Sequence, residues 1–496
     1  RILYMTPTPD KQRIKVDDLA LKVRDDCDRS RWNEDLYEEF LDILCGDREY
    51  QKEAIREALR YVVGGEYENL RSLAKENWDN NRYIEERYGT WTNFEKNLQL
   101  PDKLSASLDL ATGTGKSYII YGIAMILIAE GVVDRVLVLC PSTTIETGLL
   151  EKFKLLAGNA EMIEALPDSA CYKTPKIIQA TETIAAGCIC VENRDAVYAH
   201  VKSSIEESLW GKGAKVAVLN DEAHHVANDP AAKSRKWKEF LENPKYGFNI
   251  VLGFSGTCYV ENNYFSDVIY RYSLRKAIEQ RYVKKVKYLA EIERIGEENE
   301  DWQLRVSMHE QKRKELKPRK ITPLSIIVTP TIKKCNQVGE ELVEYLVGHH
   351  GYTGNDADEK VLVVYNNSPD VAKLPMLDEE DNKVEWIISV SMLNEGWDVK
   401  RVFQIIPHDE RAFNSKLLIA QVLGRGLRVP EEWKGEQPEV VIFNHASWAG
   451  SIRHLVDEIL ENEKQITGKV LEEPEYHFKL HNLKYNVNKR SEEKVK

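Results

Sequence analysis

The chain has 496 residues, of which 42% are hydrophobic and 30% are charged, and its formal net charge at pH 7 is −12. This length allows about three domains of roughly 150 residues each. No apolar stretch approaches the roughly 20 residues that a membrane-spanning helix needs, and the cysteines are scattered and indicate reduced thiols. We therefore expect a cytoplasmic protein with no membrane partner. The negative charge excludes a wholly basic nucleic-acid coat but leaves room for a local basic groove.

The first hundred residues are expected to be mainly helical. Residues 1–47 form a polar N-terminal extension, and a helix is predicted over 50–63. Near its start, Gln51 offers a paired donor and acceptor that can read the edge of adenine, with a surface glutamine as the alternative. In the insertion at 66–100, aromatic side chains alternate with charged ones. They can stack on bases, but their spacing is more typical of a small helical core.

A glycine-rich turn follows the predicted strand 104–110 and precedes an apolar helical stretch at 119–129. Its residues, called the phosphate loop below, are Ala111, Thr112, Gly113, Thr114, Gly115, Lys116 and Ser117. The glycines let backbone N–H groups face a phosphate chain, and the helix N-terminus adds partial positive charge. Lys116 can then reach the β- and γ-phosphates and Ser117 can hold Mg²⁺. An ordinary turn is the alternative, because Leu110 stands where the strict motif has glycine.

Further apolar strands follow, each ending in polar residues. The predicted strand 135–140 leads to small hydroxyl residues, 215–220 delivers Asp221 and Glu222, and 249–254 ends at Ser255. At the carboxyl end of a strand beside a phosphate loop, Asp221 can bind Mg²⁺ through water, and Glu222 can polarise the water that attacks the phosphate. Strands that alternate with helices predict an α/β domain over 48–258, a mostly parallel sheet with helices on both faces.

A second α/β domain is predicted over 321–447. The charge-dense residues 259–320 are expected to form a linker, and its basic run 312–320 either touches phosphate or is simply solvated. Residues 448–496 are expected to be a helical tail. The predicted strands of the second domain are 324–329, 361–365, 384–390, 402–406 and 440–443.

The second domain has no phosphate loop, but it carries two arginines in a glycine-rich segment that follows Gln421. An arginine that reaches the γ-phosphate from a facing domain neutralises the charge of the transition state, which is worth roughly 10³ to 10⁵ in rate. Arg425 and Arg428 are candidates for such arginine fingers, and an exposed basic helix is the alternative.

In combination, these motifs resemble superfamily 2 helicase-type ATPases with two RecA-like domains. The resemblance rests on Gln51, the phosphate loop, the Asp-Glu-Ala-His sequence at 221–224, the Ser-Gly-Thr sequence at 255–257 and the Gln-x-x-Gly-Arg-Gly-x-Arg sequence at 421–428. Within the superfamily the chain is most similar to the Res (ATPase and translocase) subunit of type III restriction enzymes. The residues that carry this finer similarity are 220–225, 267–282, the Asn-Glu-Gly-Trp-Asp-Val sequence at 394–399, and 424–428.

The resemblance implies a role for each motif. ATP and Mg²⁺ would bind at the phosphate loop and Asp221, with Gln51 on the adenine. Glu222, Gln421, Arg425 and Arg428 would act in hydrolysis. Gly396 and Asp398 would link the nucleotide to the nucleic-acid track. Coupling of hydrolysis to domain motion would fall to His224, Ser255 and Thr257.

We therefore expect an ATP-dependent motor that favours duplex DNA, within a restriction or phage-defence system and with a nuclease or methyltransferase as partner. Res subunits also carry a nuclease domain with a Pro-Asp…Asp/Glu-x-Lys core. Pro369, Asp370, Asp381 and Lys383 spell that core formally, but they lie between predicted strands, so we expect no nuclease here. The alternatives are an RNA helicase or remodeller and a nucleotide-gated scaffold that binds without turnover. The intact Lys116, Glu222 and Arg425 argue against the scaffold.

Overall fold

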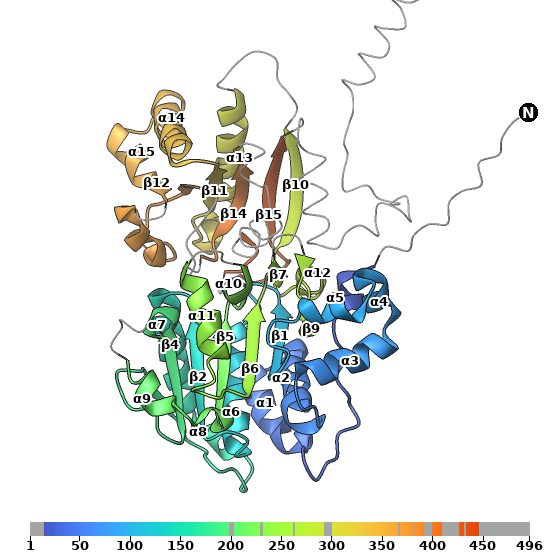
Figure 1. Cartoon of the computed structure of the whole chain (residues 1–496). Coiled ribbons are helices and arrows are strands. Elements are labelled where there is room, and N and C mark those ends of the chain that lie inside the picture. Colours follow the sequence, from blue (N-terminus) through green and yellow to red (C-terminus); the bar gives the residue numbers. More distant parts are fainter. Residues whose placement is uncertain are drawn as a thin grey trace, which may run out of the picture.

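Two parallel sheets dominate the computed structural model of the protein, which describes residues 14–197, 203–228, 232–260, 263–291, 300–365, 368–379, 381–390, 399–408, 426–430 and 433–445. The first sheet has the strand order β3-β4-β2-β5-β6-β1-β9, and the second has the order β10-β15-β14-β11-β13-β12. They occupy the lower and upper halves of Figure 1. Every neighbouring pair within these two sheets is parallel. The predicted α/β fold of two mostly parallel sheets is confirmed.

The first sheet is buried on both faces. Its strands are β1 (Leu104–Leu110), β2 (Arg135–Cys140), β3 (Lys176–Ile178), β4 (Cys188–Asn193), β5 (Val216–Asp221), β6 (Ile250–Ser255) and β9 (Val268–Tyr272). Alternate residues of β2 join different clusters: Val136 and Val138 pack with helix α6, and Leu137 and Leu139 with Trp237 of α11. Helices therefore cover both faces, which is why these strands are continuously apolar.

Helix α6 (Lys116–Ala129) lies in the interior. Every residue from Ile119 to Ala129 is buried, so the helix is apolar all round and has no polar face. The other helices of this half are α7 (Thr143–Ala157), α8 (Ala160–Glu164), α9 (Ile205–Leu209), α10 (His224–Asn228) and α11 (Ala232–Glu242), with short 3₁₀ turns at Arg194–Val197 and Gly213–Lys215.

The insertion at 66–100 is a small helical unit beside β1 (Figure 1). It consists of α3 (Leu70–Asn80), α4 (Arg82–Tyr88) and α5 (Trp91–Lys96). The ring of Trp78 lies 6.1 Å from that of Trp91 and 5.9 Å from that of Phe94. The aromatic residues thus pack on one another, as the helical-core interpretation predicted.

The second sheet consists of β10 (Lys285–Glu291), β11 (Leu324–Thr329), β12 (Val361–Val364), β13 (Trp386–Val390), β14 (Val402–Pro407) and β15 (Glu439–His445). Its helices are α13 (Glu300–Leu316), α14 (Ile332–His350) and α15 (Gly354–Lys360), with 3₁₀ segments at Lys317–Arg319 and Pro369–Met376. None of the helices in the described part of the chain has the length and apolar character needed to span a bilayer.

Residues 259–320 differ from the linker that the sequence suggested. They contain the hairpin β7 (Tyr259–Val260) and β8 (Asn263–Tyr264), then β9, α12 (Leu274–Glu279), β10 and α13. β9 pairs with β1 and β10 pairs with β15, so both sheets extend into this stretch. Charged residues such as Arg271 and Lys287 interrupt the apolar pattern of these outer strands, so the sequence pattern did not predict them. The predicted helical tail at 448–496 lies outside the described residues, and the domain boundaries stay predictions.

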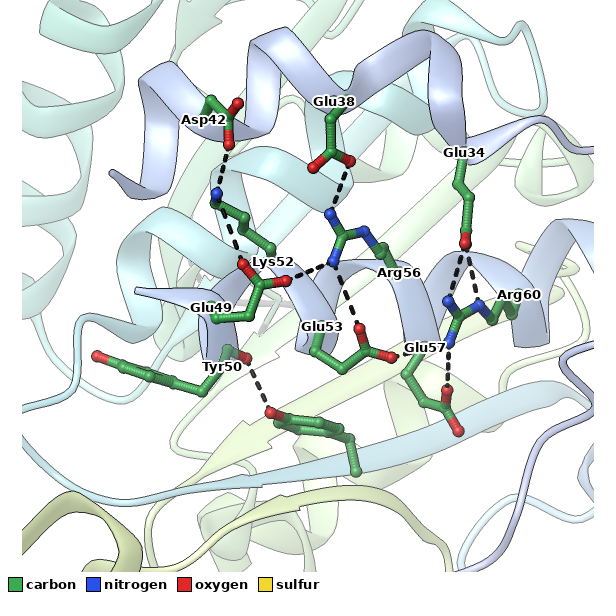
Figure 2. Close-up of polar contacts among 11 residues, drawn as sticks. Glu34, Glu38, Asp42, Glu49, Tyr50, Lys52, Glu53, Arg56, Glu57 and Arg60 are labelled. Atoms are coloured by element: carbon green, nitrogen blue, oxygen red, sulfur yellow. Dashed lines mark hydrogen bonds and ion pairs between the residues drawn. The ribbon is translucent and has the colours of Figure 1, made fainter. Parts of the chain in front are cut away.

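A ladder of ion pairs joins consecutive N-terminal helical segments to one another (Figure 2). This half begins with the 3₁₀ turns Val16–Leu19 and Glu34–Tyr37, α1 (Glu38–Cys45), α2 (Glu49–Leu59) and a π-helical turn at Arg60–Gly64. Lys52 and Arg56 on α2 and Arg60 at the start of the π-helical turn are four residues apart and form one row. They pair with Asp42, Glu38 and Glu34 on the preceding segment. Glu49, Glu53 and Glu57 flank the same row.

The ladder is partly buried, which strengthens it. The basic side chains are only 10% to 16% exposed, and Arg60 bonds both carboxylate oxygens of Glu34 at 2.9 Å. Burial raises the pKa of Glu57 to about 7, although the charge of Arg60 opposes that shift. Because such bidentate pairs fix geometry as well as adding energy, the ladder sets the position of α2 and hence of Tyr50 and Gln51 near its start.

We predict that Arg60→Met destabilises the first half by about 1–2 kcal/mol, because it leaves several partly buried carboxylates without their cation. Thermal unfolding of the full chain measures this as a lower first transition. Lys75→Met is the matched control, since Lys75 and Asp79 are both about half exposed and such a pair contributes about 0.5 kcal/mol or less. Equal shifts for the two variants would contradict the structural role of the ladder.

Candidate nucleotide site

The phosphate loop has the backbone that a phosphate cradle requires. Gly113 and Gly115 have φ values of +83° and +81°, a region that residues with a Cβ atom rarely adopt. Gly115 also directly precedes α6, which begins at Lys116. A Cβ atom on Gly115 would lie 2.5 Å from Nε2 of Gln51. The turn is therefore specific to glycine, and its N–H groups lie at a helix N-terminus, where anions bind.

Parallel pairing brings the predicted acidic residues to the same edge. β6 lies between β1 and β5, so the strand ends that carry the phosphate loop, Asp221 and Ser255 are adjacent. Lys116 Nζ forms an ion pair with Glu222 and lies 3.9 Å from Oδ1 of Asp221. Burial alone would lower the pKa of Lys116, but the two carboxylates raise it above the ordinary value. Lys116 is thus held as a cation at the centre of the site.

Glu222 has an unusual backbone. Its φ is +51°, in the left-handed region that costs a residue with a side chain about 1 kcal/mol or more. The N–H of Glu222 donates to Oδ1 of Asp221 at 3.0 Å. This turn directs the Glu222 carboxylate to Lys116. Strained backbone of this kind concentrates at functional sites, which favours a chemical role for Glu222.

The three residues expected to couple hydrolysis to motion lie together. His224 Nδ1 is 2.8 Å from Oγ of Ser255 and 3.0 Å from Oγ1 of Thr257. All three side chains are buried, and Nδ1 of His224 also lies 3.5 Å from Oε2 of Glu222. A Cβ on Gly256 would meet Oγ1 of Thr112 at 2.6 Å. The Ser-Gly-Thr segment thus contacts both the Glu222 turn and the phosphate loop.

Gln51 lies beneath the phosphate loop rather than on the surface. It is 1% exposed, and its Nε2 donates to the carbonyl of Thr114 at 2.7 Å. The Tyr50 hydroxyl donates to the same carbonyl at 2.8 Å, and the Tyr50 ring stacks on Tyr272 at 3.9 Å. Oε1 of Gln51 is buried and has no hydrogen-bond partner among the described residues. The surface alternative is wrong, and one acceptor of this amide remains for a donor.

Arg428 reaches this site from the second half of the chain. A Cβ atom on Gly113 would lie 3.0 Å from Cγ of Arg428, and the charge of Arg428 opposes the raised pKa of Lys116. The sequence also missed Lys152 of α7, whose Nζ donates to Oγ of Ser117 at 3.1 Å. No motif marks a lysine in the middle of a helix. Of the other predicted site residues, Gly396, Asp398, Gln421 and Arg425 lie outside the described residues.

The donors at the site suit a hard cation. A hydroxyl (Ser117) and a carboxylate (Asp221) are the oxygen ligands that Mg²⁺ takes when phosphates supply the rest. No cluster of three or more His, Cys, Asp or Glu side chains able to hold a metal occurs among the described residues. This includes the segment that formally spells a nuclease core, where Lys383 pairs with Glu359 at 2.8 Å.

Comparison with known proteins finds a family match for one segment of the chain. Residues 45–260 match the family model of the type III restriction enzyme, res subunit. The resemblance seen in the motifs is confirmed for this Res-like segment. No curated protein matches the chain.

Several solved structures are similar in fold. The type ISP restriction-modification enzyme LlaBIII bound to DNA is 14% identical, with a TM-score of 0.48 over 84% of this chain. This chain spans only 29% of LlaBIII. Saccharomyces cerevisiae Dbp5 bound to RNA and ADP BeF3 is 13% identical, with a TM-score of 0.44 over 78% of this chain and 90% of Dbp5. Mycobacterium smegmatis helicase Lhr bound to ssDNA and AMP-PNP is 13% identical, with a TM-score of 0.46 over 72% of this chain and 46% of Lhr.

For the Res-like segment we predict that Gln51→Ala weakens the binding of ATP by roughly tenfold, because uncharged hydrogen bonds of the amide are lost. The binding of inorganic triphosphate should weaken by less. The lost Nε2 bond loosens the phosphate loop for both ligands, whereas the lost Oε1 acceptor affects only adenine. Calorimetric titration measures both affinities. Gln337→Ala on α14, where the amide donates an exposed hydrogen bond to Glu341, is the control. Equal losses for the two ligands would restrict Gln51 to loop support.

Proposed function

We propose that the protein is an ATP-dependent motor acting on nucleic acid, with the nucleotide bound at the phosphate loop and hydrolysis completed by arginines of the second half. The observation that carries this proposal is Arg428 lying against Gly113 of the phosphate loop. A phosphoryl-transfer site needs positive charge on both sides of the γ-phosphate. Here Lys116 supplies it from the first half and Arg428 from the second.

Lys116 exchanges partners in the proposed cycle. Its ammonium now contacts Glu222, and a γ-phosphate that takes this ammonium releases the Glu222 carboxylate. The released carboxylate then accepts a proton from the attacking water. Mg²⁺, when bound by Ser117 and Asp221, neutralises charge on the phosphates. The His224–Ser255–Thr257 cluster contacts Glu222, so a change in the Glu222 turn is transmitted to the Ser-Gly-Thr segment.

Adenine recognition is supported by the buried Oε1 of Gln51, which lacks a partner among the described residues. The exocyclic amino group of adenine is a donor of the required kind, whereas guanine presents a carbonyl at that place. A buried acceptor left unpaired costs about 1–3 kcal/mol. Adenine therefore satisfies this acceptor and guanine does not, which favours ATP over GTP.

Duplex DNA is the proposed substrate, and a restriction or phage-defence system with a nuclease or methyltransferase partner is the proposed context. The match of residues 45–260 to the Res model supports both. Gly396 and Asp398 are proposed to link nucleotide and track. Rates of ATP hydrolysis measured with duplex DNA, single-stranded DNA and RNA test this: the largest stimulation is expected from duplex DNA. Stimulation by RNA alone would make the protein an RNA remodeller.

We predict that Lys116→Ala abolishes hydrolysis and weakens ATP binding, because the phosphates lose their cation. Glu222→Gln should retain ATP and stop turnover, because only the group that polarises water is lost. A nucleotide-binding assay beside a phosphate-release assay separates the two effects. Hydrolysis by Glu222→Gln at the wild-type rate would show that another residue activates the water.

Arg428→Ala should keep ATP affinity within about threefold and lower kcat by roughly 10²-fold or more, as expected for a contact made mainly in the transition state. Arg425→Ala should have the same effects on ATP affinity and kcat as Arg428→Ala. Arg319→Ala is the control, because Arg319 stacks on Trp433 instead, 4.4 Å from the ring centroid. If Arg428→Ala lost affinity and kcat together, the arginine would be a ground-state phosphate ligand.

A further inference from the structure

A lysine is completely buried where the chain enters the second sheet. Lys284 is 0% exposed and immediately precedes β10. Burial lowers the pKa of its ammonium well below the ordinary value, and no carboxylate among the described residues lies within ion-pair distance of it. A buried lysine is costly unless its donors are used. A methionine would fill the same space at no such cost, so the ammonium requires an explanation.

Three backbone carbonyls surround this ammonium. Lys284 Nζ donates to the carbonyl oxygens of Lys400 at 2.7 Å, Val402 at 2.6 Å and Gly426 at 3.1 Å. An ammonium has three N–H donors, so all of them are used. Nζ also lies 4.5 Å from the centroid of the Phe403 ring, a favourable arrangement for a cation. Three carbonyl acceptors match the three N–H donors of the charged form, and these hydrogen bonds oppose the effect of burial on the ammonium.

Lys284 thereby fixes the segment that carries Arg428. In addition to the Gly426 contact, the backbone N–H of Lys284 donates to the carbonyl of Leu427 at 2.7 Å. The Leu427 side chain is fully buried. A Cβ on Gly426 would lie 2.5 Å from Cδ1 of Ile405, so the segment lies directly on β14. Lys284 therefore holds Gly426 and Leu427, the two residues that precede Arg428.

The same lysine connects to the first half. It lies five residues after the end of α12 and twelve after β9, which pairs with β1, the strand that leads to the phosphate loop. On its other side, β10 pairs with β15 of the second sheet. Lys284 thus lies on the described path from one sheet to the other, next to the segment that delivers an arginine to the phosphate loop.

We propose that Lys284 is a positioning residue for Arg428: its ammonium holds the Gly426–Leu427 backbone on β14, and this directs the arginine towards the nucleotide. Lys284 touches neither nucleotide nor water in this role and acts only through Arg428. The proposal rests on the proposed ATPase function.

The test is a double-mutant cycle in the full chain. Lys284→Met keeps the apolar stem and leaves three carbonyls without a donor. It should lower kcat for ATP by roughly tenfold or more and leave KM within about threefold, because a misplaced finger affects mainly the transition state. In an Arg428→Ala background, Lys284→Met should change kcat by no more than about twofold, since residues that act as a unit are not additive. Lys285→Met, at the exposed neighbouring residue, is the matched control and should hydrolyse ATP at the wild-type rate.

The outcomes separate this proposal from the function itself. Two results would overturn the positioning role, provided that the wild type is active. One is an unchanged kcat in Lys284→Met. The other is that Lys284→Met lowers kcat in the Arg428→Ala background as much as it does in the wild type. A wild type that hydrolyses no ATP with any nucleic acid would instead overturn the proposed function. Thermal unfolding shows whether Lys284→Met folds, and Lys284→Gln, which keeps an uncharged donor, replaces it with the same measurements if it does not.

Discussion

The site depends on one balance of charge: a partly buried lysine cation at the start of α6 lies beside two carboxylates at the end of β5. The ion pair of Lys116 with Glu222 and its proximity to Asp221 require a backbone that approaches closely. This accounts for the left-handed glycines of the phosphate loop and the left-handed Glu222. Arg428 adds positive charge to the same place. An incoming phosphate chain completes a set of charges that the fold has already gathered.

Much of this arrangement could be predicted from the sequence, because the decisive signals are local. A glycine turn between a strand and a helix, or an acidic pair after an apolar strand, is visible within ten residues. Helical spacing also predicted that the aromatic residues of 66–100 form a small core, as the packing of Trp78 on Phe94 shows. β9 and β10 could not be predicted in the same way. In β9 the charged residue Arg271 bonds Asp109, 162 residues earlier in the chain, at 3.0 Å, and this compensation depends on tertiary structure.

Gln51 and Lys284 show the same limit for polar side chains. Nothing near Gln51 in the sequence reveals that its amide faces the carbonyl of Thr114, 63 residues away. Nothing near Lys284 reveals that its acceptors come from residues 400, 402 and 426. Sequence patterns identify apolar faces and catalytic motifs. They do not identify the interior polar groups that hold those motifs in place, since such groups are defined by acceptors from several distant segments.

The pairing of β9 with β1 affects where the chain can be divided. β9 is the outermost strand of the first sheet, next to the strand that leads to the phosphate loop. A fragment ending shortly after the Ser-Gly-Thr segment would leave β1 with an unprotected edge, and such edges recruit strands from other molecules and aggregate. A fragment that keeps the edge of β1 paired therefore has to include β9. A fusion that preserves this pairing must join beyond residue 272.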